Sequence, residues 1–453
     1  MDSQEKKKAQ EARFQDLTTT PIEKLIPRLA LPTMVSMMVT ALYNAADTYF
    51  VGRISTEATA AVGLVFSIMA IIQALGFFCG HGSGNYLSRM LGGGHKKEAS
   101  EAASTGFALA LCIGLFLAIV GNLFVEPLAY LCGAEVTTLA DTMAYMRIIL
   151  IGAPFMTGQF VLNNQLRFQG SALYAMIGLL SGAVVNVALD PLLILGLHMG
   201  VRGAAIATIS GQFMSFCMLF LGSRKGANIR IRLQDVHFNS HYLLEIVNGG
   251  APSLCRQGLA AVATLLLNHM AGNLGGDAAV AGMSIVTRVT MMMSSALIGF
   301  GQGYQPVCSF NYGANIKSRV RQGYFFCVKY GVIFLTVIAV VCYLFAEPIV
   351  RCFRDDPVVV EVGARALRFQ TCVFPVNAVI VMTNMMLQSI GKGVKASIMA
   401  SARNGICFIP MILILPSLFG LTGVEVSQTC ADVLTFLLSI PFAVTELRKM
   451  KEA

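Results

Sequence analysis

The chain has 453 residues, of which 55% are hydrophobic and only 13% are charged, and its mean hydropathy is +0.68. Soluble domains carry about a quarter charged residues, so the composition excludes an ordinary soluble protein and indicates one that crosses a lipid bilayer many times. The formal net charge of +9 could suggest a nucleic-acid partner. Because the basic residues lie in short loops between apolar runs, we expect no nucleic acid and interpret them as topology signals.

Twelve segments of the chain are long and apolar enough to span a membrane, which takes about 20 residues. The expected spans are 24–52, 58–86, 102–125, 140–164, 171–196, 203–222, 243–272, 279–308, 322–346, 362–388, 395–418 and 423–445. The connections between them are short, so little chain remains for an enzymatic domain on either side. We therefore expect an all-α integral membrane protein that is not an enzyme.

Lys and Arg are concentrated in the two terminal segments and in the connections from each even span to the next odd one. Because cytoplasmic loops carry an excess of these residues, both termini are expected in the cytoplasm and the protein in the plasma (inner) membrane as a multi-pass protein. One loop runs against this pattern, since it holds Arg351, Arg354, Arg365 and Arg368 on the outer side.

The two halves of the chain repeat, with an offset of about 220 positions. The recurring residues are Gly80 and Gly301, Gly82 and Gly303, Ser88 and Ser309, Gly92 and Gly313, Pro154 and Pro375, and Gly203 and Gly423. Six spans per half make both halves enter the membrane in the same direction. We therefore expect two six-helix lobes, 1–222 and 243–453, related by a pseudo-two-fold axis along the membrane normal, with a cytoplasmic linker at 223–242 and a substrate cavity between the lobes.

Two acidic residues, Asp47 and Asp190, lie inside apolar spans of the first half. An acid within a membrane is costly and by default suggests a functional site. Both are expected in the outer half of their helices, and Asn186 lies at i−4 from Asp190, on the same helical face. Tyr145 and Thr208, near the outer ends of the fourth and sixth spans, have a similar depth.

Two carboxylates that meet at low dielectric cannot both stay charged without a counter-ion, so a shared proton or metal cation is expected. Asn, Thr and Tyr can supply further oxygens, either for a hard cation or for a hydrogen-bond network that holds a proton. The alternative is structural: Asp47 caps the first helix, and Asp190, next to Pro191, ends the fifth. The second half has no acid at the repeat positions, near Asn268 and Met411, which favours a function over a scaffold requirement.

Several stretches resemble the multidrug and toxic compound extrusion (MATE) transporters. They are PTMVSMMVTALYNAADTYFVGR, SRMLGGGHKKEA, LRFQGSA and NVALDPLLILGLHMGVRGAAIATISGQ, and the similarity extends over nearly the whole chain. The resemblance implies a cation-coupled antiporter, driven by H⁺ or Na⁺, that exports organic cations and lipophilic drugs by alternating access. It implies no cofactor and small organic partners, and we expect a monomer in the lipid bilayer.

One branch of that family has its cation site in the N-terminal lobe, and its motif residues fall on Asp47, Tyr145, Asn186, Asp190 and Thr208. If the coupling ion is Na⁺, the resemblance implies the metal ligands Asp47, Asn186, Asp190 and Thr208. Another branch carries a Glu on helix 7 and an Asp on helix 10. This chain has no acid after Pro252 in the seventh span and has Asn377 and Asn384 in the tenth, so coupling through the second half is doubtful.

The second half supplies further intramembrane groups that could line a substrate cavity: Arg256, Gln257, Met291 and Asn377. Flexible thioethers such as that of Met291 suit a promiscuous binding wall, although ordinary core packing explains them as well. Arg288, Lys329 and Arg403 are interpreted as side chains that reach the membrane interface.

The main alternative is a flippase, which the acidic residues of the first half argue against. The sequence also bears on two further functions: the loop motif disfavours a major facilitator, and the residues leave an intramembrane protease open. A flippase of the same superfamily for lipid-linked oligosaccharides would need a basic cavity, for which Arg256 and Arg288 are the candidates. A major facilitator would carry a GxxxDxxGRR-like loop where this chain has SRMLGGGHKKEA. An intramembrane aspartyl protease would use Asp47 and Asp190 as its dyad, and a peptide-cleavage assay would distinguish it from a transporter.

Overall fold

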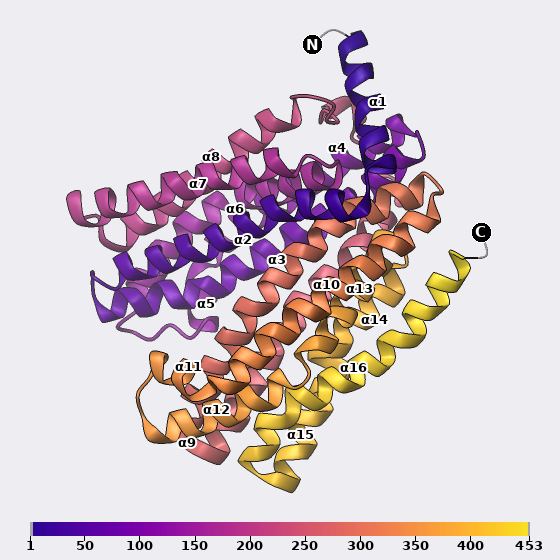
Figure 1. The fold of residues 1–453 in the computed structure, drawn as a ribbon. Coiled ribbons are helices and arrows are strands. Elements are labelled where there is room, and N and C mark those ends of the chain that lie inside the picture. Colours follow the sequence, from indigo (N-terminus) through magenta and orange to yellow (C-terminus); the bar gives the residue numbers. More distant parts are fainter. Residues whose placement is uncertain (1–2, 452–453) are drawn as a thin grey trace. The chain divides into compact units, whose positions relative to one another are not determined.

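The computed structural model describes residues 3–451, and among these it describes all side chains except those at 3, 6, 41–46, 48 and 56. Within this part every regular element is a helix and no strand occurs. This agrees with the bilayer's requirement that backbone polar groups be satisfied inside the segment. The expected all-α fold is therefore confirmed, and Figure 1 shows the course of the chain.

The first six spans follow a short helix, α1 (Ser3–Thr19), that the sequence did not lead us to expect. They are α2 (Ile22–Val51), α3 (Thr56–Gly92), α4 (Lys96–Leu123), α6 (Leu139–Phe168), α7 (Ala172–Pro191) with the π-turn η1 (Leu192–Gly196), and α8 (Gly200–Ser223). The short helix α5 (Val125–Leu131) and the turn η2 (Leu233–Asp235) lie in the connections. The bounds of each of these six spans agree with those of an expected span to within about six residues.

The last six spans contain more breaks than the first six. They are the two halves of α9 (Ser240–Gly313), α10 (Lys317–Leu344), α12 (Pro357–Thr371) with α13 (Phe374–Ser389), α14 (Gly393–Ser401) with η3 (Ala402–Ile406) and α15 (Phe408–Phe419), and α16 (Leu421–Lys449). The helix α11 (Ala346–Phe353) follows α10. Within residues 3–451, these elements correspond to the twelve spans that the sequence predicts.

Local sequence explains where the helices break. Gly276 has φ 62° and ψ −161° inside α9, a conformation open to glycine, so α9 is two spans joined by a tight turn. The tenth span bends by 57° between α12 and α13, and Pro375 lies in the first turn of α13. At the start of α12, the side chain of Asp356 accepts hydrogen bonds from the backbone N–H groups of Val358 and Val359, at 3.0 and 3.3 Å.

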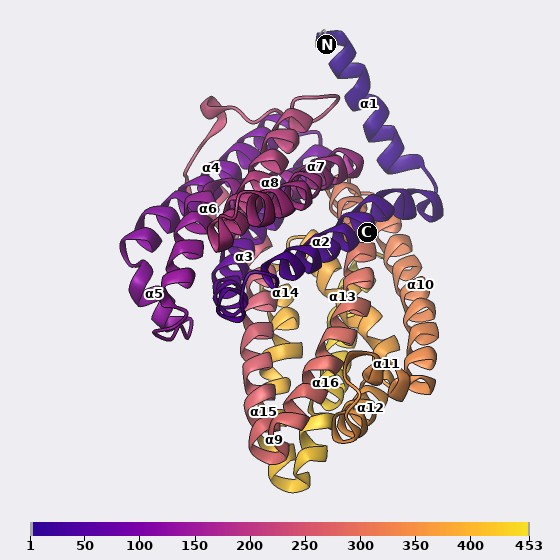
Figure 2. The same cartoon turned by 90° about the vertical axis from the view of Figure 1, so that its left-hand side faces the viewer.

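The chain divides into two compact units. Unit 1 comprises Met1–Thr20, Arg28–Gly250 and Gly313–Asn315, and unit 2 comprises Pro21–Pro27, Ala251–Tyr312 and Ile316–Ala453. The segment 223–242, which the sequence suggests as a linker, falls in unit 1 together with the first turns of α9. Within unit 1, α7 and α8 run side by side in both views (Figures 1 and 2), and this pair carries much of the candidate site.

Candidate functional site

The helices α7 and α8 touch backbone to backbone at a pair of glycines. A Cβ atom added at Gly182 would lie 2.4 Å from the carbonyl oxygen of Gly211 and 2.0 Å from Oγ of Ser215. A Cβ added at Gly211 would lie 2.7 Å from the carbonyl oxygen of Gly182. Small residues allow such close approach of helices in a membrane. This crossing fixes the position of the polar residues that follow on α7.

Asn186 lies one turn beyond Gly182 and packs against α8, because a Cβ at Gly211 would be 3.0 Å from the Cβ of Asn186. Thr208 lies one turn before Gly211 on α8, and its hydroxyl donates to the carbonyl of Ala204 at 3.0 Å. Both side chains are buried, with 4% and 6% exposure. The amide oxygen of Asn186 has no hydrogen-bond partner among the described residues.

The carboxyl group of Asp190 is completely buried, and neither of its oxygens accepts a hydrogen bond from the described part of the chain. One oxygen of Asp47, on α2, is in the same situation. Val51, one turn beyond Asp47, and Ile194, one turn beyond Asp190, belong to the same apolar cluster, so the two acids lie on elements that pack together. The neighbouring side chains at 41–46 and 48 lie outside the described set.

Tyr145 belongs to an apolar cluster that joins the helices of the site. The cluster contains Val51, four residues beyond Asp47, and Ile194, four beyond Asp190. It also contains Ala204, one turn before Thr208. Tyr145 on α6 is itself 1% exposed, so it belongs to a core that joins α2, α6, η1 and α8.

This arrangement has a definite chemical consequence. Asp190 and one oxygen of Asp47 are buried, as are the amide oxygen of Asn186 and the side chain of Thr208, and the described residues offer the two acids no base. Buried charges normally require a partner. The group therefore suits a mobile counter-charge, either a proton shared by Asp47 and Asp190 or a small hard cation.

The residues expected to line a substrate cavity belong to unit 2, where each has its own described surroundings. Arg256 on α9 donates to the amide oxygen of Asn384 at 3.5 Å. Gln257 beside it is half-buried, whereas the side chain of Met291 is 67% exposed. Asn377 is buried on α13 and donates to Asp432 at 3.1 Å.

The sequence analysis missed two buried acids of unit 2, Glu425 and Asp432 on α16. Glu425 accepts two hydrogen bonds from Arg365, at 2.6 and 2.7 Å. Asp432 pairs with Arg403 at 2.9 Å, so the interpretation of Arg403 as an interface side chain was wrong. The sequence does carry a signal for them, because two acids lie about two helical turns apart within one apolar span. They do not lie at the repeat positions of Asp47 and Asp190.

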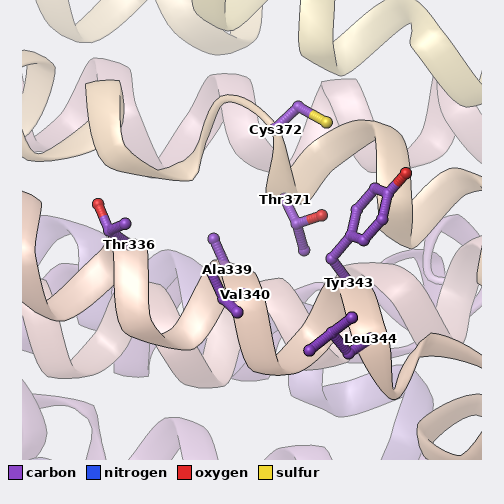
Figure 3. Close-up of a pocket in the computed structure, with 7 residues that line it drawn as sticks. All are labelled: Thr336, Ala339, Val340, Tyr343, Leu344, Thr371 and Cys372. Atoms are coloured by element: carbon purple, nitrogen blue, oxygen red, sulfur yellow. The ribbon is translucent and has the colours of Figure 1, made fainter.

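A groove of about 230 Å³ lies elsewhere in unit 2, where α10 passes the bend between α12 and α13. Figure 3 shows its lining residues: Thr336, Ala339, Val340, Tyr343, Leu344, Thr371 and Cys372. None of them is charged, and Tyr343 and Leu344 are exposed apolar side chains. These properties fit a helix face that contacts lipid, and the groove contains none of the candidate site residues.

The sequence pattern of the MatE family matches residues 32–192 and 252–414. The chain belongs to this family. The match covers most of both halves, and the family resemblance noted in the sequence is thereby confirmed. Since its members are transporters and the chain has many apolar helices, this MATE protein is a multi-pass membrane protein.

Two relatives and two solved structures illustrate the similarity. The "Multidrug export protein MepA" of Staphylococcus haemolyticus (strain JCSC1435) is 30% identical over 433 residues, 94% of each chain. That of Staphylococcus aureus (strain MRSA252) is 29% identical over 426 residues, 92% of each. A crystal structure of "MATE in complex with MaL6" has a TM-score of 0.90, 26% identity and coverage of 97% of this chain and 99% of the other. An "outward-facing conformation of a multidrug resistance MATE family transporter" has a TM-score of 0.89, 26% identity and coverage of 97% and 98%.

Proposed function

We propose that this MATE protein is a cation-coupled antiporter that exports organic cations and lipophilic drugs, with Asp47 and Asp190 as the coupling acids. The similarity to multidrug export proteins supports the drug substrates. Both termini would be cytoplasmic in the plasma membrane, in accord with the distribution of Lys and Arg. The protein would act through small organic substrates and a coupling ion, without a cofactor.

One observation carries this proposal: both oxygens of Asp190 and one oxygen of Asp47 are buried, yet the described residues supply them with neither a hydrogen-bond donor nor a base. A fold that needed these acids only for stability would pair them, as α16 does with Glu425 and Asp432. A site that must gain and lose a cation in every cycle has to lack a permanent partner. Asn186 and Thr208 add oxygens from α7 and α8 at the same place.

The cycle follows from charge. With the site open to the outside, a proton or Na⁺ enters and neutralises part of the charge on Asp47 and Asp190. This change favours rearrangement of α2 and release of the drug, and the ion leaves to the cytoplasm after reorientation. Inward movement of one positive charge yields about 2.3 kcal/mol per 100 mV of membrane potential, which supports a modest gradient of an uncharged drug. Exchange of one such ion for one monovalent organic cation moves no net charge, so the concentration gradient of the ion drives that exchange.

The experiment that tests this function uses purified protein in liposomes loaded with ethidium, a fluorescent organic cation. A pH gradient and a Na⁺ gradient are imposed separately. Efflux that accelerates under one of the two supports the antiporter and identifies its ion. If neither gradient has an effect while a fluorescent lipid-linked oligosaccharide is translocated, the protein is a flippase and the proposal is wrong.

A further inference from the structure

Helix α16 carries three buried acids on one face, each matched by a base from another helix of unit 2. Glu425, Asp432 and Glu446 are separated by multiples of about seven residues, roughly two helical turns, and none is more than 3% exposed. Their partners are Arg365 at 2.6 Å, Arg403 at 2.9 Å and Lys395 at 2.5 Å. Unit 2 thus neutralises its described buried acids on α16 with its own side chains.

Asp432 is the one of the three that lies deep in the span, about 16 Å from Leu421 at about 1.5 Å per residue. Its Oδ1 accepts from Nε of Arg403 and from the amide of Gln428, both at 2.9 Å. Its Oδ2 accepts from the amide of Asn377 at 3.1 Å and from the second Arg403 nitrogen at 3.4 Å. Three elements, α13, η3 and α16, therefore converge on one carboxylate.

The surroundings of Asp432 have the composition of a cation site. The amide oxygen of Asn377 is buried and accepts no hydrogen bond from the described residues, so an acceptor stands beside the carboxylate without a donor. Arg403 enters from the π-turn η3 and keeps 26% of its side chain exposed, whereas Asp432 is buried. The only positive charge that these contacts give the site is thus a guanidinium that belongs to the chain itself.

We propose that Asp432 and Asn377 form a second cation site, which Arg403 fills permanently, and that Arg403 thereby confines ion coupling to unit 1. The role of Arg403 in ion coupling rests on the proposed function, whereas the cation site at Asp432 does not. While Arg403 is in place, Asp432 and Arg403 sum to zero charge and take up nothing during the cycle. Without Arg403, the carboxylate would bind one transported proton or Na⁺ in addition to the ion bound at Asp47 and Asp190.

The first test removes the guanidinium and offers it back in solution. Purified Arg403→Ala and Arg403→Ala/Asp432→Asn proteins are heated in detergent with and without millimolar guanidinium chloride, with an equal concentration of NaCl as the salt control. We expect guanidinium to raise the melting temperature of Arg403→Ala by several degrees and to leave the double variant unchanged. Equal responses of the two variants would overturn the cation site. This test does not depend on transport, so it stands even if the proposed function fails.

The second test measures the ratio of coupling ions to ethidium, from the imposed ion gradient at which net ethidium flux stops in liposomes. Arg403→Gln is expected to take up one more ion per ethidium than the wild type, and Arg403→Gln/Asp432→Asn to return to the wild-type ratio. Lys395→Gln serves as the matched control, because Glu446 keeps Lys449 at 3.6 Å. A wild type without ion coupling would refute the proposed function. If the wild type is ion-coupled and Arg403→Gln has the same ratio of ions to ethidium, the proposed function stands and the role of Arg403 in ion coupling is refuted.

Discussion

The backbones of Gly182 and Gly211 are so close that neither residue has room for a Cβ atom. Their contact holds α7 against α8, with Asn186 one turn beyond Gly182 on α7 and Thr208 one turn before Gly211 on α8. The positions of Asn186 and Thr208 therefore depend on glycine, which has no side chain, at both 182 and 211. This relationship yields a stability prediction that can be checked without a transport assay.

Gly182→Ala is expected to destabilise unit 1, because the new methyl group meets Ser215 and the carbonyl of Gly211. Overpacking of this kind costs about 1–3 kcal/mol. Gly222→Ala on the same helix pair is the matched control, since its Cβ would find its nearest neighbour, Tyr174, at 3.5 Å. Thermal unfolding in detergent should show a clear loss for the first variant and little change for the second, and equal melting temperatures would contradict the close crossing.

Replacement of a buried acid by its amide should affect thermal stability differently at Asp190 and at Asp432. Asp190→Asn removes a carboxylate that has no base among the described residues, so we expect unchanged or increased thermal stability. Asp432→Asn leaves Arg403 without its carboxylate, and loss of one partner of a buried pair costs roughly 3–5 kcal/mol. Because Arg403 is 26% exposed, the lower end of that range is expected. Parallel melting curves check both, and a greater loss in Asp190→Asn would contradict the assignment of the unpaired acid.

Thr208→Val should weaken binding of the coupling ion while preserving the shape of the side chain. The variant removes an oxygen whose net value is about 1 kcal/mol, or roughly fivefold in affinity. The ion concentration that gives half-maximal ethidium efflux should rise by about that factor. Thr208→Ser, which keeps the hydroxyl, should resemble the wild type. Identical ion dependence of the two variants would exclude Thr208 from the ion site.

The topology can be tested with a membrane-impermeant maleimide on intact cells. Cys352 is exposed on α11, in a connection expected outside, so it should react as the single cysteine in a cysteine-free background. Arg230→Cys in the same background should react only after permeabilisation. Cys132, also expected outside, should react more slowly than Cys352, because burial raises the pKa of its thiol and lowers the reactive thiolate fraction. The reverse labelling of Cys352 and Arg230→Cys would invert the assigned orientation.

Much of the fold could be predicted from the sequence because a bilayer allows few solutions. Apolar length set the twelve spans, and the period of an α-helix placed Asn186 and Asp190 on one face. The break at Pro375 was not predicted, although the proline marks it in the sequence. The two π-turns were not predicted because they depend on packing against neighbouring helices. Arg403 and Asp432 were not paired in advance for the same reason: spacing along α16 aligns its acids, but it does not say which base from η3 or α12 reaches each of them.

The central claim is that Asp47 and Asp190 bind the coupling ion, and ion-driven ethidium transport in inside-out vesicles tests it most directly. The wild type and Glu126→Gln, which changes an exposed acid on α5, should accumulate ethidium under the effective gradient. Asp47→Asn and Asp190→Asn, at equal amounts of folded protein, should show no gradient-driven accumulation. Accumulation at the wild-type rate in both of these variants would contradict the mechanism.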